Sequence, residues 1–582
     1  MKPIIEFKNF SFKYRSQKEA TIKDINLAIY PGEKVLIVGP SGSGKSTLAH
    51  CINGLVPFAY KGEITGTYTI NGQNPHDLGI FGLSKLVGTV LQDTDGQFIG
   101  LTVAEDIAFS LENDMVPQPE MFERVAKVAE TVEVQSVLGH APGALSGGQK
   151  QRVSMAGVMI DQVDILLFDE PLANLDPATG KRAIELIDQI YRQDKTTVVI
   201  IEHRLEDALT CGADRIIVIG DGRIVADMTP DELLPQDILQ QEGIREPLYV
   251  TALKYAGCKL AKEDHPADIQ TMDREGHLAG YKGQVRDWFT QTRVPKTEQE
   301  REIILEVKNL DFAYRKDKPV LKDVSFRIHK GEMLSIVGKN GAGKSTLSNL
   351  ICGFLLPDQG SISLHGEDIL ERSIKERGES IGLVMQNPNQ MISKTMIFEE
   401  VALGLQVRGV APEEIETRVF DTLKICGLYP FRNWPISALS YGQKKRVTIA
   451  SILVMNPDII ILDEPTAGQD YRHYTEIMEF LKGINKEKGI TIVMITHDMH
   501  LMLEYTDRAL VIAEGQLLAD KRPSEVLTDD VLTKKAYLKR TSLYDLAVGC
   551  GINPPSDLVD CFIYYERENG RKMEETEPCQ EY

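Results

Sequence analysis

The sequence predicts an α/β protein built from two tandem, closely similar domains. Two observations lead to this prediction: the chain has 582 residues, and short motifs of its first half return in its second half at nearly constant spacing. A chain of this length is too long for one hydrophobic core and fits two domains of about 250 residues each. Its 42% hydrophobic and 26% charged residues are ordinary for a globular protein.

Four motifs carry the internal repeat, which is the strongest organisational signal in the chain. They are GPSGSGKST at 39–47 and GKNGAGKST at 338–346; LSGGQKQRV at 145–153 and LSYGQKKRV at 439–447; ILLFDEP at 165–171 and IIILDEP at 459–465; and His203 and His497. The spacing repeats as well: the signature serine precedes the first acidic residue of DEP by 23 residues in both halves, and that residue precedes the histidine by 34. A duplicated domain is therefore expected.

The repeat also sets the expected domain boundaries. The pattern Arg-x-x-Leu-Tyr-x-x-Ala at 245–252 returns at 540–547, so the region after the fourth motif is expected to be a C-terminal lobe rather than a linker. We therefore expect a first domain at 1–291, a short polar linker at 292–301, a second domain at 302–570 and an acidic, frayed tail at 571–582.

Each GxxxxGK[ST] motif follows an apolar strand pattern, KVLIV or MLSIV, and precedes a helical pattern, which is the context that a phosphate-binding P-loop needs. Glycines let backbone N–H groups turn toward phosphate, the lysine reaches the outer phosphates and the serine ligates Mg²⁺. The residues expected to bind the nucleotide here are Gly39, Ser41, Gly42, Ser43, Gly44, Lys45, Ser46 and Thr47, and Gly338, Asn340, Gly341, Ala342, Gly343, Lys344, Ser345 and Thr346.

The acidic pairs end apolar runs that are typical of buried parallel strands, at the edge where such sheets bind ligands. Asp169 and Asp463 are expected to hold Mg²⁺, and Glu170 and Glu464 to orient and deprotonate the attacking water.

Further candidates end neighbouring strands. Gln92 and Gln386 are expected to touch Mg²⁺ or the water, and His203 and His497 the γ-phosphate; a lone histidine is more often structural, but the equal 34-residue spacing favours function.

Two tyrosines lie in matching strand patterns, FKYR and FAYR. Tyr14 and Tyr314 are expected to stack on adenine, since aromatic side chains stack on bases without sequence preference. Packing in the core is the alternative for both.

Together these motifs resemble those of the ABC ATPase family, and LSGGQ is the specific element because other P-loop enzymes lack it. The resemblance implies two tandem P-loop ABC ATPase domains that hydrolyse ATP, each with a mixed sheet core, a helical lobe at about 93–144 or 387–438 and a small C-terminal extension. It implies that the signature of one domain caps the ATP held by the other, so that one chain supplies both ATPase halves. The signature residues are Ser146, Gly147, Gly148 and Gln149, and Ser440, Gly442 and Gln443.

The segment at 87–113 is similar to the ATPases of energy-coupling-factor (ECF) importers for vitamins and transition metals, whose pattern runs Q-N-P-D-N-Q-F. The first domain keeps Asp95, Gln97 and Phe98 but has Asp93-Thr94 for Asn-Pro; the second keeps Asn387-Pro388 and then departs. The fused form with GQDY also looks like ATPases assigned to thiamine or its pyrimidine precursor. The resemblance implies a transmembrane coupling subunit and a substrate-binding membrane subunit as partners, and a peripheral place on the cytoplasmic face of the cell membrane.

Charge bears on the competing functions. The net charge of −20 argues against a general nucleic-acid binder, which needs cations to displace phosphate counterions. Tandem ABC proteins that act on ribosomes join their domains by a long basic arm, whereas residues 238–300 hold nine Lys/Arg and ten Asp/Glu. A soluble role on ribosomes or DNA and an exporter motor remain the alternatives. No apolar stretch of about 20 residues is present, and Glu6 and Lys8 interrupt any signal-like start, so membrane contact is expected only through partners.

Overall fold

The computed structural model describes residues 2–92, 95–173, 175–292, 294–295, 301–467 and 469–576. The chain divides into two compact units, Met1–Trp288 with Asp470–Arg472, and Phe289–Gln469 with His473–Tyr582. Most of the expected linker at 292–301 and the end of the expected tail, 577–582, lie outside the described residues, as do Asp93, Thr94, Asn174 and Gly468 beside the predicted sites.

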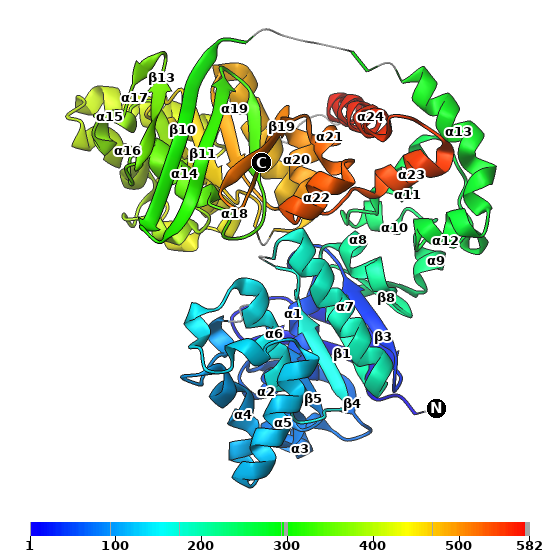
Figure 1. Cartoon of the computed structure of the whole chain (residues 1–582). Coiled ribbons are helices and arrows are strands. Elements are labelled where there is room, and N and C mark those ends of the chain that lie inside the picture. The colour runs from blue at the N-terminus through cyan, green and yellow to red at the C-terminus, as the bar shows by residue number, and fades with distance from the viewer. Residues whose placement is uncertain are drawn as a thin grey trace. The chain divides into compact units, whose positions relative to one another are not determined.

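The first unit contains a six-stranded sheet in the order β5-β6-β7-β3-β8-β9 and a three-stranded antiparallel sheet in the order β2-β1-β4 (Figure 1). The larger sheet is parallel except that β9 runs antiparallel to β8. The strands are β1 (Ile5–Tyr14), β2 (Ile22–Ile29), β3 (Lys34–Val38), β4 (Gly62–Ile70), β5 (Val87–Val90), β6 (Ile165–Asp169), β7 (Thr197–Ile201), β8 (Arg215–Gly220) and β9 (Arg223–Met228).

The second unit repeats this plan. Its six-stranded sheet has the order β15-β16-β17-β12-β18-β19, and a four-stranded sheet has the order β11-β10-β13-β14. The strands are β10 (Ile303–Arg315), β11 (Lys318–His329), β12 (Met333–Val337), β13 (Gln359–Leu364), β14 (Glu367–Asp368), β15 (Ile381–Val384), β16 (Ile459–Asp463), β17 (Thr491–Ile495), β18 (Arg508–Ala513) and β19 (Gln516–Lys521). The α/β fold class expected from the sequence is confirmed in both units.

The core of the first unit lies between its two sheets and α1. Phe7 and Phe10 of β1 pack their rings against Tyr68 of β4, with centroids 5.3 and 4.9 Å away. The same core contains Ile37 of β3 and Leu48 of α1, so the antiparallel sheet covers the P-loop helix and the parallel sheet together. This packing fixes the strand end that carries the P-loop. The second unit has the corresponding core.

In the first unit the α-helices are α1 (Lys45–Ile52), α2 (Leu55–Phe58), α3 (Pro75–Ser84), α4 (Val103–Asn113), α5 (Gln118–Thr131), α6 (Gly147–Met159), α7 (Pro177–Asp194), α8 (Leu205–Ala208), α9 (Pro230–Leu233), α10 (Ile238–Gln241), α11 (Leu248–Tyr255), α12 (Ile269–Arg274) and α13 (His277–Gln291). In the second unit they are α14 (Lys344–Cys352), α15 (Ile374–Arg377), α16 (Ile397–Val407), α17 (Pro412–Ile425), α18 (Tyr441–Leu453), α19 (Tyr471–Lys488), α20 (Met499–Tyr505), α21 (Pro523–Leu527), α22 (Asp530–Ala536), α23 (Ser542–Cys550) and α24 (Pro555–Thr576).

Helices α4, α5 and α6 pack together beside the sheet, as do α16, α17 and α18 in the second unit (Figure 1). Apolar residues keep a helical spacing over 122–138, within the expected helical lobe. The helix is shorter than this spacing: α5 ends at Thr131, and Glu133 takes a left-handed φ of 59° before a short 3₁₀ turn. At the other end of the chain, α24 runs to Thr576, into the segment expected to fray.

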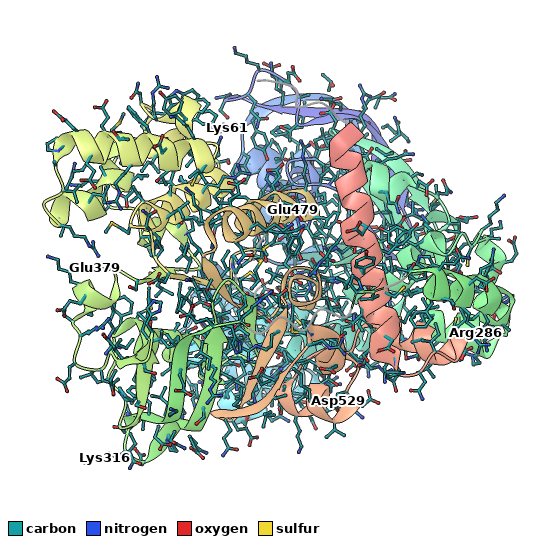
Figure 2. The ribbon with its side chains drawn as sticks, turned by 90° about the horizontal axis from the view of Figure 1, so that it is seen from above. Lys61, Arg286, Lys316, Glu379, Glu479 and Asp529 are labelled. Carbon is teal, nitrogen blue, oxygen red and sulfur yellow. The ribbon has the colours of Figure 1, made fainter. Side chains whose placement is uncertain are left out.

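Charged side chains gather at the surface of each unit. Figure 2 labels Lys316 and Glu379, which are exposed at the edge of the second unit, whereas its apolar side chains fill the core. Within the described residues no helix is both long enough and apolar enough to cross a bilayer.

Candidate functional site

The P-loop of the first unit follows β3 and turns into α1 through glycines that the backbone geometry requires. A Cβ on Gly39 would lie 2.2 Å from the carbonyl oxygen of Ile219, so only glycine permits this close approach. Gly44 precedes α1 with a left-handed φ of 103°, and Gly343 takes the same φ before α14. Both loops therefore present the first turn of a helix at the carboxyl end of a central strand.

The P-loop lysines fold back over their own loops. Lys45 Nζ donates to the carbonyls of Gly39 and Pro40, both at 2.8 Å, and Lys344 Nζ donates to Gly338 at 2.7 Å. Burial lowers the pKa of Lys45 to about 8, although Glu170 opposes the shift. Ser43 Oγ is buried and has no hydrogen-bond partner among the described residues. A cationic, partly desolvated loop with an unpaired hydroxyl suits a phosphate group.

Each predicted catalytic glutamate meets the predicted histidine of its own unit. His203 Nε2 lies 2.8 Å from Glu170 Oε1, and His497 Nδ1 lies 2.7 Å from Glu464 Oε1. Both glutamates take left-handed φ values, 49° for Glu170 and 46° for Glu464, which are uncommon for residues with a side chain. Strained backbone of this kind is frequent at functional sites.

The glutamine of the first unit joins this group. Gln92 Nε2 donates to Glu170 Oε2 across the ends of β5 and β6. Three predicted catalytic side chains, Gln92, Glu170 and His203, therefore converge at one sheet edge. In the second unit the backbone carbonyl of Gln386 accepts hydrogen bonds from the Tyr441 hydroxyl at 3.3 Å and from Lys445 Nζ at 2.7 Å.

The expected Mg²⁺ ligands offer hard oxygen atoms, the donors that this ion prefers. In the second unit Ser345 Oγ donates to Asp463 Oδ2 at 3.1 Å, so hydroxyl and carboxylate already lie together. In the first unit burial, with Glu170 beside it, raises the pKa of Asp169 to about 6. Both donor sets fit Mg²⁺: Ser46 and Asp169, or Ser345 and Asp463, would hold it, and the bound ion would neutralise phosphate charge.

The two predicted adenine-stacking tyrosines differ in surroundings. The Tyr14 hydroxyl lies 3.1 Å from Thr47 Oγ1, and its half-buried ring packs edge-on against Phe12 and Tyr60. Burial raises the pKa of Tyr14. Tyr314 makes the matching contact with Thr346 at 3.3 Å, but 61% of its surface is exposed. Of the two rings, Tyr314 has more free surface for a base.

The signature motifs form the N-terminal caps of α6 and α18. Ser146 Oγ accepts from the backbone N–H of Gln149, whose side-chain oxygen accepts from Ser146 N at 2.9 Å; Ser440 and Gln443 form the same capping box. Gln149 and Gln443 therefore shape the start of each helix, a role that was not expected from the sequence. The glycines of the two motifs differ: a Cβ on Gly148 would lie 2.3 Å from Thr179 Cγ2, whereas a Cβ on Gly442 would meet open space.

Two further positions near the catalytic pairs were missed. Glu202 is buried next to His203, and its carboxylate accepts from the backbone N–H groups of Leu172 at 3.0 Å and His203 at 2.8 Å. Thr496 takes its place in the second unit. Lys445 is buried under the Gln386 carbonyl, and burial lowers its pKa to about 8. Each position had a signal in the sequence. Glu202 is a charged residue directly after the apolar run VVII, and Lys445 is a charged residue within the signature helix.

Comparison with known proteins identifies the family of this chain. A family model described as ABC transporter matches residues 22–173 and 321–467, and one described as ATP-binding cassette cobalt transporter matches residues 236–312. An ABC transporter ATP-binding protein of Clostridium perfringens is 58% identical over 97% of this chain and 99% of its own length, and one of Enterococcus faecalis is 60% identical over the same shares. Among solved structures, cbiO1 from Clostridium perfringens, part of the ABC transporter complex cbiONQ, is 38% identical over 40% of this chain and 94% of its own length, with a TM-score of 0.38.

Proposed function

Because this chain belongs to the family of ABC transporter ATP-binding proteins and is an ATPase of that family, we propose that it powers an ECF-type importer for a vitamin or a transition-metal ion. One chain supplies both ATPase halves. It works at the cytoplasmic face of the cell membrane, held there by a transmembrane coupling subunit and a substrate-binding membrane subunit. The match of residues 236–312 to the cobalt-transporter model supports import of a metal ion over the other solutes.

The observation that carries the ATPase role in both halves is the pair of glutamate–histidine contacts. Each carboxylate sits one residue beyond the aspartate that would hold Mg²⁺, and each is oriented by an imidazole nitrogen within 2.8 Å. Phosphoryl transfer needs positioning and charge neutralisation more than covalent chemistry. A lysine, an aspartate and an oriented glutamate supply these in each unit.

Transport is tested by reconstituting the chain with its membrane partners in proteoliposomes. ATP is supplied on the side that carries this chain, and the movement of radioactive Co²⁺ and of labelled thiamine is followed. Movement of solute toward the side that carries this chain and the ATP, lost in the double variant Glu170→Gln with Glu464→Gln, supports an importer. Movement in the opposite direction identifies an exporter. The absence of ATP-dependent movement of any solute would contradict a transport role.

Partner dependence has its own test. The purified chain should not sediment with protein-free lipid vesicles, because its net charge of −20 is repelled by anionic lipids. Co-expression with the membrane subunits should bring it to the membrane fraction. Sedimentation with ribosomes instead would favour the soluble alternative.

A further inference from the structure

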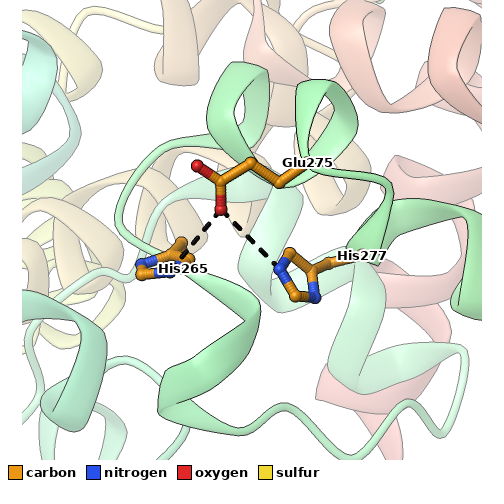
Figure 3. Close-up of side chains that lie close together, drawn as sticks. All are labelled: His265, Glu275 and His277. Atoms are coloured by element: carbon orange, nitrogen blue, oxygen red, sulfur yellow. Dashed lines mark ion pairs between the residues drawn. The ribbon is translucent and has the colours of Figure 1, made fainter.

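A group of metal-ligating side chains lies outside the nucleotide sites, in the C-terminal lobe of the first unit. His265, Glu275 and His277 each offer one ligand atom, and the three atoms lie within 4.8 Å of one another (Figure 3). Glu275 Oε2 is the shared point: His265 Nε2 lies 3.6 Å from it and His277 Nε2 lies 3.7 Å from it. The ε nitrogens of both rings therefore face the same carboxylate.

Local chain geometry brings the three together. Helix α12 ends at Arg274, Gly276 turns the chain with a left-handed φ of 84°, and α13 begins at His277. Glu275 and His277 therefore flank one tight turn. His265 comes from the loop before α12 and also takes a left-handed φ, of 52°. The ligands span only twelve residue steps, so little chain has to be ordered to bring them together.

A carboxylate lies beside the Nδ1 atom of each imidazole. His265 Nδ1 lies at hydrogen-bond distance, 3.0 Å, from Asp231 Oδ2, and His277 Nδ1 lies at ion-pair distance, 3.7 Å, from Asp264 Oδ1. A carboxylate bonded to Nδ1 favours the tautomer whose Nε2 lone pair is free, and it orients the ring, as in the carboxylate–histidine–metal arrangement of metalloproteins. Asp231 would act in this way on His265, whose Nε2 faces Glu275.

The two outer carboxylates are themselves anchored. Asp231 Oδ1 accepts the backbone N–H of Ala267 at 2.9 Å. Asp264 Oδ2 accepts the Tyr281 hydroxyl at 2.6 Å and the backbone N–H of Ala261 at 2.8 Å. Hydrogen bonds that do not involve the histidines therefore fix the positions of Asp231 and Asp264, the two carboxylates beside the rings.

We propose that His265, Glu275 and His277 form a binding site for a divalent first-row transition-metal ion such as Co²⁺, Ni²⁺ or Zn²⁺. Two imidazoles and a carboxylate suit these ions, whereas Mg²⁺ prefers oxygen donors alone. Ligand atoms about 2.0–2.1 Å from a tetrahedral ion lie about 3.3 Å apart, close to the separations on the shared oxygen. This site is separate from the nucleotide sites and does not depend on the transport function.

Charge and access both favour a cation. Three carboxylates, Asp231, Asp264 and Glu275, surround two histidines, and within the described part of the chain no lysine or arginine forms an ion pair with them. The side chains of His265 and Glu275 are 47% and 43% exposed, so an ion can enter from solvent and a water can fill the fourth position. The bound ion would join the loop before α12 to the start of α13 and stabilise the lobe by mass action.

The test uses the full-length, nucleotide-free chain, stripped of metal with chelator and kept in excess Mg²⁺, so that Mg²⁺ competes with Co²⁺ for the expected Mg²⁺ ligands of the nucleotide sites. Titration with Co²⁺ is followed by its visible absorption and by equilibrium dialysis, and Zn²⁺ is added as competitor. We expect one equivalent of Co²⁺ per chain and its displacement by Zn²⁺. The double variant His265→Gln with His277→Gln should lose this equivalent, and Asp231→Asn should weaken binding about 10–100-fold.

His365→Gln is the matched control, since His365 is also exposed and lies 3.3 Å from a carboxylate, that of Asp458, without a second histidine. It should bind Co²⁺ like the wild type. Thermal unfolding gives a second readout: Co²⁺ should raise the melting temperature of the wild type and leave that of the double variant unchanged, while both melt alike without metal. No stoichiometric binding by the wild type, or equal binding by the double variant, would overturn the proposal and leave the cluster as ion pairs.

Discussion

The imidazole of His203 meets the carboxylate of Glu170 through Nε2, whereas its counterpart His497 meets Glu464 through Nδ1. The two units thus reach the same glutamate–histidine contact with opposite ring nitrogens. The surroundings of the two pairs differ as well. Glu202 accepts the backbone N–H of His203, whereas in the second unit Thr496 Oγ1 donates to Glu464 Oε2 at 3.4 Å.

This difference predicts opposite tolerance to amide substitution. A glutamine amide reaches about as far as Nε2 and an asparagine amide about as far as Nδ1, and either can donate to the carboxylate. His203→Gln should therefore retain more activity than His203→Asn, and His497→Asn more than His497→Gln. A lost hydrogen bond to a charged group costs about 1.5–3 kcal/mol, or about 10–100-fold in rate. ATPase rates are measured in chains whose other unit carries the glutamate-to-glutamine change; the same order in both units would contradict the prediction.

A second prediction concerns the glutamates themselves. Glu170→Gln and Glu464→Gln should each lower ATP turnover, and the double variant should lose it, because removal of a positioned base costs about 10²–10⁴-fold. Binding of a fluorescent ATP analogue should persist, since the P-loops are untouched. Glu479→Gln, a change of a half-buried glutamate in α19 that pairs with Lys482, is the control and should leave turnover unaltered. Full turnover in the double variant would refute the assignment of the base.

Some features of the fold and of the site could be predicted from the sequence, and others could not. The P-loops, the strands before them and the acidic strand ends could be predicted because each rests on a local pattern whose period or glycine content has a direct physical cause. Tertiary packing decided the rest. The apolar spacing at 122–138 does not show that the chain turns at Glu133, and no spacing shows that Lys445 folds under the Gln386 carbonyl while Gln151, at the same place in α6, donates to the carbonyl of Pro171.

The third prediction follows from the crowded carboxylates at the end of β6. Burial and Glu170 raise the pKa of Asp169 from 3.8 to about 6, so the folded chain binds this proton more tightly than the unfolded chain. Stability is therefore lost as pH rises from about 4 to about 6. At about 1.4 kcal/mol per pKa unit, the ionised group costs at most about 3 kcal/mol at pH 7.

Asp169→Asn should accordingly raise the melting temperature of the nucleotide-free, Mg²⁺-free chain at pH 7, while ATP hydrolysis is lost. The gain should shrink as pH falls below 6. Asp463→Asn provides the comparison: Ser345 donates to that carboxylate and opposes the rise in its pKa, so a smaller gain is expected. Calorimetry between pH 5 and pH 8 measures both; a destabilised Asp169→Asn chain at pH 7 would show that the carboxylate has a stabilising partner.

The fourth prediction is that the two ATP sites are unequal and that Tyr441 contributes. Tyr441 stands where the first signature has Gly147, and its hydroxyl and Lys445 Nζ both bind the carbonyl of Gln386. Among the described residues neither Gly147 nor Gln151 makes the matching bond to Gln92. The second unit therefore ties the start of its signature helix to the loop after β15, and the first does not. One neutral hydrogen bond contributes about 0.5–1.5 kcal/mol, enough to change the opening of a loop several-fold.

Tyr441→Phe should therefore speed amide hydrogen exchange at residues 386–391 about two- to tenfold, the equivalent of that hydrogen bond. Tyr441→Gly should speed it at least as much, and exchange in the corresponding loop after β5 should stay as it was. The unequal loops should also give unequal losses of ATPase rate in Lys45→Ala and Lys344→Ala, because each variant leaves only one type of site at work. Equal losses from the two lysine variants, with both rates unmoved by Tyr441→Gly, would rule the asymmetry out; unchanged exchange in Tyr441→Phe would show that Lys445 alone holds the loop.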